Sequence, residues 1–199
     1  MDFIVIIVRI ISYLVALYQF LRTKLGSLRV TETTTSCPLA IVGIGLRLPG
    51  GVKNDSEFWD LLVNKRCARK ELPADRYNID GFDSESGQRG SVRCKYVYCL
   101  DEDISQFDAE FFNISPVELA RMDPQQRLLL KVVWECMESG GQVAWQGKDI
   151  GCFVGVSGED WLDMTRKDYQ NLGQGRVGDT GDFAIANRVS YQYDLRGPR

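Results

Sequence analysis

The chain has 199 residues, 44% hydrophobic and 26% charged, which is enough for one globular core. Its net charge of −3 provides no basic surface, so nucleic acid is excluded as a partner. The sequence contains no histidine, so neither a Ser-His-Asp triad nor a Cys-His pair can be built from it.

The first 30 residues form a hydrophobic N-terminal segment. The apolar run from Phe3 to Leu21 is long enough to span a bilayer, although Arg9 interrupts it. A central arginine costs roughly 2.5–3.5 kcal/mol on insertion scales, and the basic residues after the run would leave the main body in the cytosol. A membrane anchor, an interfacial helix and a wrongly predicted first exon all stay open. We therefore expect a cytoplasmic protein that is membrane-associated only if residues 3–21 insert.

A polar linker, residues 31–37, precedes the predicted globular domain, residues 38–199. Leu39 to Gly45 predicts a short buried strand that enters a glycine turn at Pro49-Gly50-Gly51. Gly43-Ile-Gly45 also suggests a dinucleotide site, but the third glycine is misplaced and no helix opens directly. A tight strand-to-loop turn is the preferred interpretation of these two glycines.

Helix signals follow in chain order. Residues 55–62 predict a helix, and residues 76–98 predict a surface excursion with short strands. Ser115-Pro-Val-Glu118 is a capping box with proline at the first helical position. Asp123-Pro-Gln-Gln126 repeats the device, with Asp123 as N-cap and Gln126 as the reaching side chain. The helix that follows, Arg127 to Met137, is apolar on most faces and is expected to be buried until Gly140-Gly141 ends it.

The last third of the chain continues the alternation. Ile150 to Val156 predicts a second buried strand, and Asp182 to Tyr193 predicts a helix that closes at Gly197-Pro198. Helices between short apolar strands indicate an α/β fold. The aromatic residues Phe107, Phe111 and Phe112 have helical spacing and are expected in the core.

The residues that could carry chemistry do not form a recognisable site. Asp101, Glu102, Asp103 and Asp108 lack the spacing of a calcium loop and are expected to form a solvated surface. Ser157 lacks nucleophile-elbow spacing. The cysteines form no CxxC pair and are expected to be reduced core residues, not zinc ligands or disulfides. They are Cys37, Cys67, Cys94, Cys99, Cys136 and Cys152.

Taken in order, these motifs resemble the N-terminal part of the β-ketoacyl synthase domain of type I polyketide and fatty acid synthases. Leu39 to Gly51 is similar to the family's opening strand and loop. Met122 to Leu130, which contains Asp-Pro-Gln-Gln-Arg, resembles its most recognisable early signature, and Gly151 to Gly155 and Asn187 to Pro198 complete the series. The resemblance covers residues 39–198 almost continuously.

The resemblance implies an incomplete thiolase-like α/β fold: the first half only, without the strand and helix of the nucleophile and without the second half. In the family, a cysteine just beyond Gly-Pro holds an acyl group as a thioester. Two histidines then assist its decarboxylative condensation with a malonyl group on an acyl carrier protein. The family cysteine would follow Arg199, and none of the six cysteines aligns with it. No catalytic, cofactor-binding or metal-binding residue is therefore assigned, and no cofactor is expected.

Two hypotheses follow. The first is an inactive fragment of a condensing domain, whose family partners are an acyl carrier protein, acyl and malonyl thioesters and a second copy in a homodimer. The second is a non-catalytic interaction or membrane-associated protein that pairs with an intact synthase. A biological truncation and a gene-model error both stay open. Residues 37–199 alone are expected to be insoluble or molten, because a missing core strand exposes apolar surface.

Overall fold

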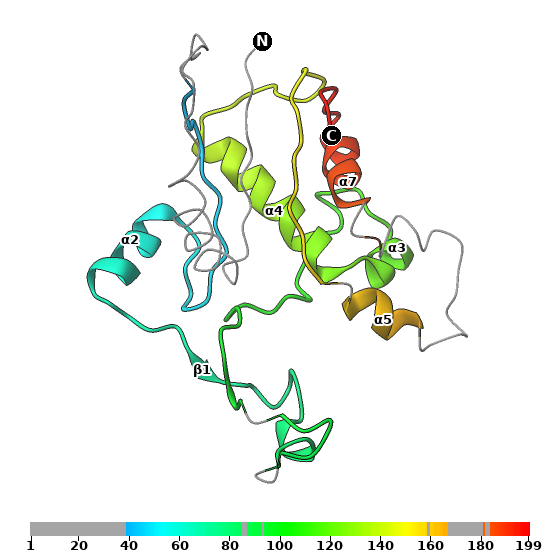
Figure 1. Ribbon diagram of the computed structural model, residues 1–199. Coiled ribbons are helices and arrows are strands. Elements are labelled where there is room, and N and C mark those ends of the chain that lie inside the picture. The colour runs from blue at the N-terminus through cyan, green and yellow to red at the C-terminus, as the bar shows by residue number, and fades with distance from the viewer. Residues whose placement is uncertain (1–38, 85–86, 93, 159, 167–180, 182–183) are drawn as a thin grey trace, which may run out of the picture. The chain divides into compact units, whose positions relative to one another are not determined.

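The computed structural model describes residues 39–84, 87–92, 94–158, 160–166, 181 and 184–199 (Figure 1). The predicted N-terminal segment and the linker, residues 1–37, lie outside the described residues, so the membrane anchor on residues 3–21 stays a prediction. Within the described ranges, no helix has both the length and the apolar character needed to cross a bilayer. The chain divides into two compact units, Leu46–Asp103 and a second unit that contains Ile104–Arg199 together with the residues up to Gly45.

The unit Leu46–Asp103 begins with the predicted glycine turn. The amide of Leu48 donates to the carbonyl oxygen of Val52 at 3.0 Å, which closes the turn. Gly50 and Gly51 adopt φ values of +87° and +76°, which a residue with a β-carbon rarely adopts. The predicted turn is therefore confirmed.

Helix α2, Asp55–Val63, confirms the predicted helix, and its first turn is capped by Asn54, whose side chain accepts from the amide of Glu57 at 2.9 Å. No residue of α2 is buried, and Trp59 is 68% exposed. After α2 come strand β1 (Lys70–Glu71), the 3-10 helix η2 (Ile79–Gly81) and strand β2 (Tyr96–Val97). Strands β1 and β2 pair antiparallel. Strand β2 lies in the predicted excursion, residues 76–98, whereas its partner β1 lies before it.

The second unit is built on helices that begin where the capping signals predict. Helix α3, Pro116–Arg121, starts after Ser115, which accepts from the amide of Glu118 at 3.2 Å. Helix α4, Pro124–Ser139, starts after Asp123, which accepts from the amide of Gln125 at 2.7 Å. Both helices carry proline at their start, where the missing N–H costs no hydrogen bond. Ser115 and Asp123 are therefore confirmed as the N-caps of the two helices.

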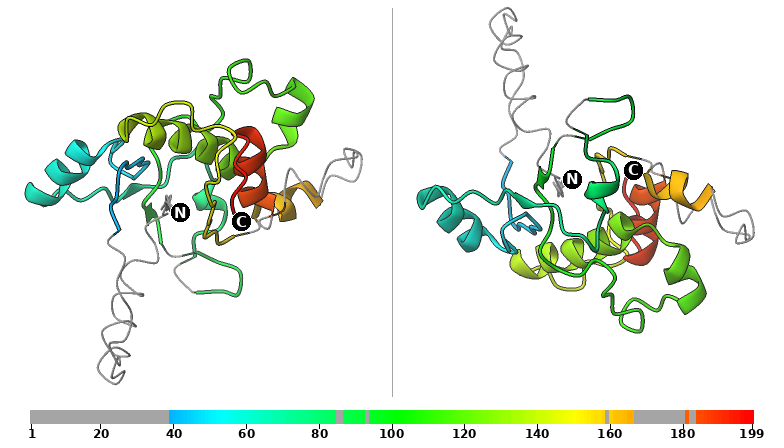
Figure 2. Two further views of the ribbon diagram at one scale, coloured as in Figure 1. Left: turned by 90° about the horizontal axis from the view of Figure 1, so that it is seen from above. Right: turned by 90° about the horizontal axis from the view of Figure 1, so that it is seen from below.

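Helix α7, Ile185–Gln192, confirms the described part of the predicted C-terminal helix. It lies beside α4 in Figure 1 and in both views of Figure 2. Helix α5, Asp160–Arg166, was not predicted. The indole N–H of Trp161 in α5 donates to the carbonyl oxygen of Arg121 at 2.9 Å, which joins α5 to the end of α3.

Aromatic side chains fill the space between α4, α7 and the loops. The rings of Trp145 and Tyr193 lie 4.7 Å apart, and those of Phe107 and Phe112 also lie 4.7 Å apart. The expectation of core phenylalanines holds for Phe112, which is 5% exposed, but fails for Phe111, which is 54% exposed. Phe111 and Phe112 lie in a turn and Phe107 in an irregular segment, since helix α3 begins only after the cap at Ser115.

Two side chains of the C-terminal segment bind backbone carbonyls far away in the sequence. The Tyr193 hydroxyl donates to the carbonyl oxygen of Leu130 at 2.6 Å, and the Gln192 amide donates to that of Phe112 at 2.8 Å. Burial raises the pKa of Tyr193, so its phenol stays protonated and remains a donor at neutral pH. These bonds fix the end of α7 to α4 and to the aromatic core.

The two predicted buried strands are the main correction. Residues 39–45 and 150–156 run extended, but neither is paired as a strand, and β1–β2 is the sheet among the described residues. Leu39 and Ile41 are 79% and 78% exposed. Near-continuous apolar runs are typical of strands with neighbours on both sides and layers on both faces. The described residues do not supply those neighbours, and residues 39–42 stay exposed. The second run is covered at its start, where Ile150 and Cys152 are buried.

The glycines at Gly43 and Gly45 do not form the expected tight turn. A β-carbon on Gly43 would lie 2.3 Å from the carbonyl oxygen of Cys136, and one on Gly45 would lie 2.5 Å from that of Val132. Both carbonyls belong to α4. The two glycines therefore let the extended segment approach the backbone of the helix, and this contact, not a turn or a nucleotide, explains them.

Candidate functional site

The five described cysteines are free thiols, and their burial differs from the expected core location. Cys152 is buried and Cys99 and Cys136 are half-buried, but Cys67 and Cys94 are exposed. Burial raises the pKa of Cys136 and of Cys152, which keeps both thiols protonated and poor nucleophiles at neutral pH. The core interpretation is therefore wrong for the two exposed thiols; Cys37 lies outside the described residues.

Cys67 has an environment that the sequence analysis missed. The backbone N–H of Arg69, followed by the Tyr98 hydroxyl, lowers the pKa of the Cys67 thiol, whose sulfur lies 3.9 Å from the hydroxyl oxygen. Side chains of alternate residues lie on one face of a strand pair. Cys67 and Arg69, which precede β1, therefore share a face with Tyr96 in β2 and with Tyr98 just after it. The spacing of two residues within each pair was the signal in the sequence that could have predicted this shared face. The face holds no base and no preorganised oxyanion donors, so it is not a catalytic constellation.

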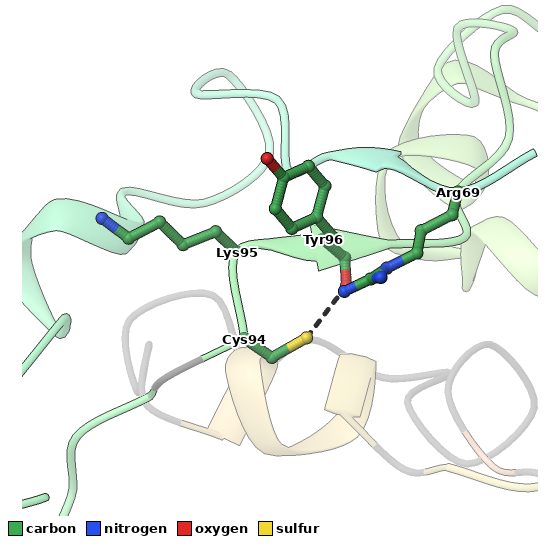
Figure 3. Close-up of a pocket in the computed structure, with 4 residues that line it drawn as sticks. All are labelled: Arg69, Cys94, Lys95 and Tyr96. Atoms are coloured by element: carbon green, nitrogen blue, oxygen red, sulfur yellow. Dashed lines mark hydrogen bonds between the residues drawn. The ribbon is translucent and has the colours of Figure 1, made fainter. Parts of the chain in front are cut away.

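A hollow of about 440 Å³ lies beside this face (Figure 3), lined by Arg69, Cys94, Lys95 and Tyr96. The Cys94 thiol donates to the carbonyl oxygen of Tyr96 at 3.0 Å, and the Arg69 guanidinium lies 4.8 Å from the centre of the Tyr96 ring. The Lys95 side chain extends away from the other three and pairs with Asp83 at 2.5 Å. These side chains hold one another and leave no acid–base pair facing the hollow.

Two members of the predicted acidic cluster, Asp101 and Glu102, form ion pairs. The Glu102 carboxylate pairs with Arg47 at 3.1 Å, and the two side chains are only 18% and 9% exposed, so a solvated surface is wrong for this pair. Asp101 pairs with Lys70, which holds the pKa of the Asp101 carboxyl below its usual value, and it also accepts from the amides of the glycine turn. In the described part of the chain no three metal-binding side chains come together.

Two remaining predicted positions have structural roles. Asp108 accepts from the amide of Phe111 at 2.9 Å and so closes a turn. Ser157 is exposed and lies outside the helices, strands and turns, next to Gly158, whose φ is +111°. Neither residue lies in a constellation that could activate a nucleophile.

Backbone groups, not side chains, form the most distinctive arrangement. Residues 148–152 and 196–198 run in the same direction and are joined by three hydrogen bonds. Arg196 donates to Lys148 at 3.0 Å, Gly197 donates to Ile150 at 3.2 Å, and Cys152 donates to Pro198 at 2.8 Å. The partners advance unevenly, so the pair is not a regular ladder. Gly197 permits the approach, because a β-carbon there would lie 2.4 Å from the carbonyl carbon of Ile150.

Beyond this pairing, the segment 153–156, which we name the open edge, makes no backbone hydrogen bond to any other described residue. Val154 and Val156 pack against the core, whereas Phe153 is 54% exposed. This alternation is that of a strand. Residues 39–42 and 44 are exposed as well.

Solved structures similar to this chain are ketosynthase domains. The ketosynthase from module 6 of the bacillaene synthase of Bacillus subtilis 168 matches with a TM-score of 0.66 and 34% identity, over 80% of this chain and 25% of that chain. The oxazolomycin ketosynthase domain from Streptomyces albus matches with a TM-score of 0.62 and 30% identity, over 79% and 27%. The fold is thus the N-terminal part of a thiolase-like condensing domain, and the predicted incomplete fold is confirmed.

The sequence comparisons agree. The family model described as "Beta-ketoacyl synthase, N-terminal domain" matches residues 37–199, and the chain belongs to this family. The highly reducing polyketide synthase g433 of a Fusarium species is 54% identical over 162 residues, and gloL of Glarea lozoyensis is 53% identical over 163 residues. Each match covers 81% of this chain but 6% of the relative, so the chain spans only a small part of the synthases it resembles.

Proposed function

We propose that residues 37–199 serve as the N-terminal scaffold of a polyketide synthase condensing domain and that the chain performs no condensation by itself. The observation that supports this proposal is that burial raises the pKa of two of its thiols. The thiols of Cys136 and Cys152 are kept protonated by burial, and the chain has no histidine to activate them. The exposed Cys67 lies on a surface strand pair without a base.

The proposal assigns the covalent chemistry to groups that this chain does not contain. In a condensing domain, a cysteine thiolate takes up the acyl group, and imidazoles assist the loss of carbon dioxide from the malonyl unit. Residues 37–199 would contribute α4, α7 and the extended segments against which such groups are held. The proposed partners are an acyl carrier protein with acyl and malonyl thioesters, and a second copy of the domain.

The test is acyl loading. The purified chain is incubated with a radiolabelled acyl thioester and then with a malonyl-loaded carrier protein, beside an intact ketosynthase domain of the Fusarium relative. We expect covalent label and elongated product only with the intact domain. Stable thioester formation on this chain followed by chain elongation would overturn the proposal. Label on Cys67 alone without elongation would be surface acylation and is separated by the Cys67→Ser variant.

The exposed apolar segments also favour a second function, that of an interaction protein which pairs with an intact synthase. Leu39 and Ile41, each more than three-quarters exposed, are the observation that favours it. Co-purification of the tagged chain with a full-length synthase would support this role. The membrane version requires residues 3–21, and unchanged cell fractionation after removal of residues 1–30 would count against it.

A further inference from the structure

The strand pair β1–β2 has one exposed face and one half-buried face. Side chains alternate between the two faces, and the alternation continues past the ends of both strands. All of these residues belong to one unit, Leu46–Asp103. The exposed face, which we name the thiol face, carries two thiols, two phenols, an arginine and a glutamate: Cys67, Arg69, Glu71, Cys94, Tyr96 and Tyr98.

The two thiols of this face are both exposed, but they have opposite hydrogen-bonding roles. The Cys94 thiol donates to the carbonyl oxygen of Tyr96 at 3.0 Å, a bond that requires the proton on sulfur. The Cys67 sulfur instead accepts from the backbone N–H of Arg69 and from the Tyr98 hydroxyl, whose oxygen lies 3.9 Å away. Both donors lower the pKa of the Cys67 thiol, because they stabilise its thiolate. Of the two thiols, Cys67 is therefore the nucleophile.

A cation lies beside this nucleophile. Among the described residues no carboxylate, that of Glu71 included, pairs with the Arg69 guanidinium. The guanidinium lies 4.8 Å from the centre of the Tyr96 ring and lines the hollow of about 440 Å³ (Figure 3). Cys67 and Arg69 are alternate residues, so their side chains lie roughly 7 Å apart. A small molecule bound to Cys67 can therefore place a carboxylate on the guanidinium, which holds that group with two parallel N–H donors.

The chemistry that suits the thiol face is thiol–disulfide exchange. Acyl transfer needs donors aimed at a tetrahedral oxyanion, and the two donors beside Cys67 are directed at its sulfur instead. In disulfide exchange the negative charge stays on sulfur throughout. The reaction therefore requires only an accessible thiolate and a disulfide to attack.

We propose that Cys67 is a site of reversible S-thiolation, at which a small disulfide that carries carboxylates forms a mixed disulfide with the chain. The Cys67 thiolate attacks one sulfur of the disulfide, so that a new S–S bond forms and the original S–S bond breaks. The electron pair leaves with the other half of the reagent as a thiolate, which takes a proton from water. Cys67 is oxidised, the disulfide is the oxidant, and a second thiol reverses the step. Thiolation here goes beyond the proposed scaffold function, since it needs neither an acyl group nor a second polypeptide.

The test compares the two exposed thiols in one reaction. The full 199-residue chain is incubated at neutral pH with glutathione disulfide, whose two halves carry carboxylates. Free thiols are then blocked with N-ethylmaleimide, and peptide mass spectrometry follows each cysteine separately. We expect Cys67 to form the mixed disulfide at least about threefold faster than Cys94, because a larger thiolate fraction outweighs the lower nucleophilicity of a less basic thiolate. Equal rates, or a preference that is as large in urea above the unfolding transition, would overturn the proposal.

Two variants separate recognition of the carboxylate from activation of the thiol. Arg69→Gln removes the guanidinium and keeps the backbone N–H. It should slow the reaction with glutathione disulfide by about two- to fivefold more than the reaction with uncharged bis(2-hydroxyethyl) disulfide, the effect of one exposed ion pair. Tyr98→Phe removes a donor to the thiolate and should slow both reagents by the same factor, about twofold or more.

Lys95→Gln is the matched control, because Lys95 also lines the hollow but extends away from it and pairs with Asp83. It removes the same charge as Arg69→Gln and should leave the ratio of the two reaction rates unchanged. A ratio that changes as much in Lys95→Gln as in Arg69→Gln would reduce the effect to net charge and refute carboxylate recognition by Arg69. A Tyr98→Phe variant whose Cys67 reacts as fast as in the wild type would refute the activation.

Discussion

Replacing Gly43 by alanine should detach the extended segment 39–45 from α4. The added β-carbon would lie 2.3 Å from the carbonyl oxygen of Cys136 and 2.9 Å from the amide nitrogen of Gly140. Both atoms belong to the helix backbone and its cap, so no flexible side chain can move aside. Overpacking of this kind costs about 1–3 kcal/mol, which corresponds to a roughly 5- to 150-fold larger fraction of the detached state.

Cys136 reports this detachment directly. Its thiol is half-buried, burial raises its pKa, and the amide of Gly45 hydrogen bonds to it. When the segment leaves α4, the thiol loses this cover and becomes reactive. We expect its labelling by N-ethylmaleimide, followed by peptide mass spectrometry, to accelerate by the same factor of about 5 to 150 in Gly43→Ala, provided that labelling proceeds through the detached state.

Gly155→Ala is the matched control, because its β-carbon would meet nothing within 4 Å and its φ is not positive. It should leave the labelling of Cys136 unchanged, and the exposed Cys67 should react at the same rate in all three proteins. If Cys136 reacts no faster in Gly43→Ala than in Gly155→Ala, the close approach of the segment to α4 is not what the glycine provides, and the reasoning is refuted.

Three further outcomes are expected. Tyr193→Phe should destabilise the contact of α7 with α4 by about 0.5–1.5 kcal/mol, because a buried hydrogen bond is lost. The measurement is the urea midpoint followed by tryptophan fluorescence, which should fall. An unchanged midpoint would show that this hydrogen bond does not stabilise the chain. Asp123→Asn should have a urea midpoint equal to or higher than that of the wild type, because burial raises the pKa of the Asp123 carboxyl and asparagine can still cap α4. Asp123→Ala should lower the free energy of unfolding by about 0.5–2 kcal/mol, because the cap is lost. Asp101→Asn should be less stable than the wild type above about pH 4, and this difference should vanish as the pH falls, because the folded-state pKa of Asp101 is lowered; a difference that grows at low pH would show the opposite sign.

The sequence was most informative where a short-range rule decides the structure. The helix starts at Pro116 and Pro124 follow from a capping side chain and a proline a few residues apart, and the turn at Gly50-Gly51 follows from the need for positive φ. These features depend on atoms close in sequence. They were predicted for that reason.

The strands were not predicted correctly because pairing depends on neighbours that no local pattern contains. Residues 39–45 and 150–156 have the composition of buried strands, yet neither run is paired in a sheet among the described residues, and only the second is partly buried, at Ile150 and Cys152. The close approach of Gly43 to α4 was missed for the same reason, since the contact joins residues about ninety positions apart. That the chain cannot catalyse condensation by itself is a prediction from its lack of histidine, and acyl loading will test it.

The long-range carbonyl contacts set the order of events during synthesis of the chain. The Tyr193 hydroxyl and the Gln192 amide close loops of 63 and 80 residues onto Leu130 and Phe112. Helix α4 therefore leaves the ribosome long before the side chains that bind it. Until then its apolar face is exposed to solvent or bound by a chaperone. A ribosome stalled before residue 192 should hold a nascent chain that is sensitive to protease, and one stalled well beyond residue 199 should hold a more resistant one.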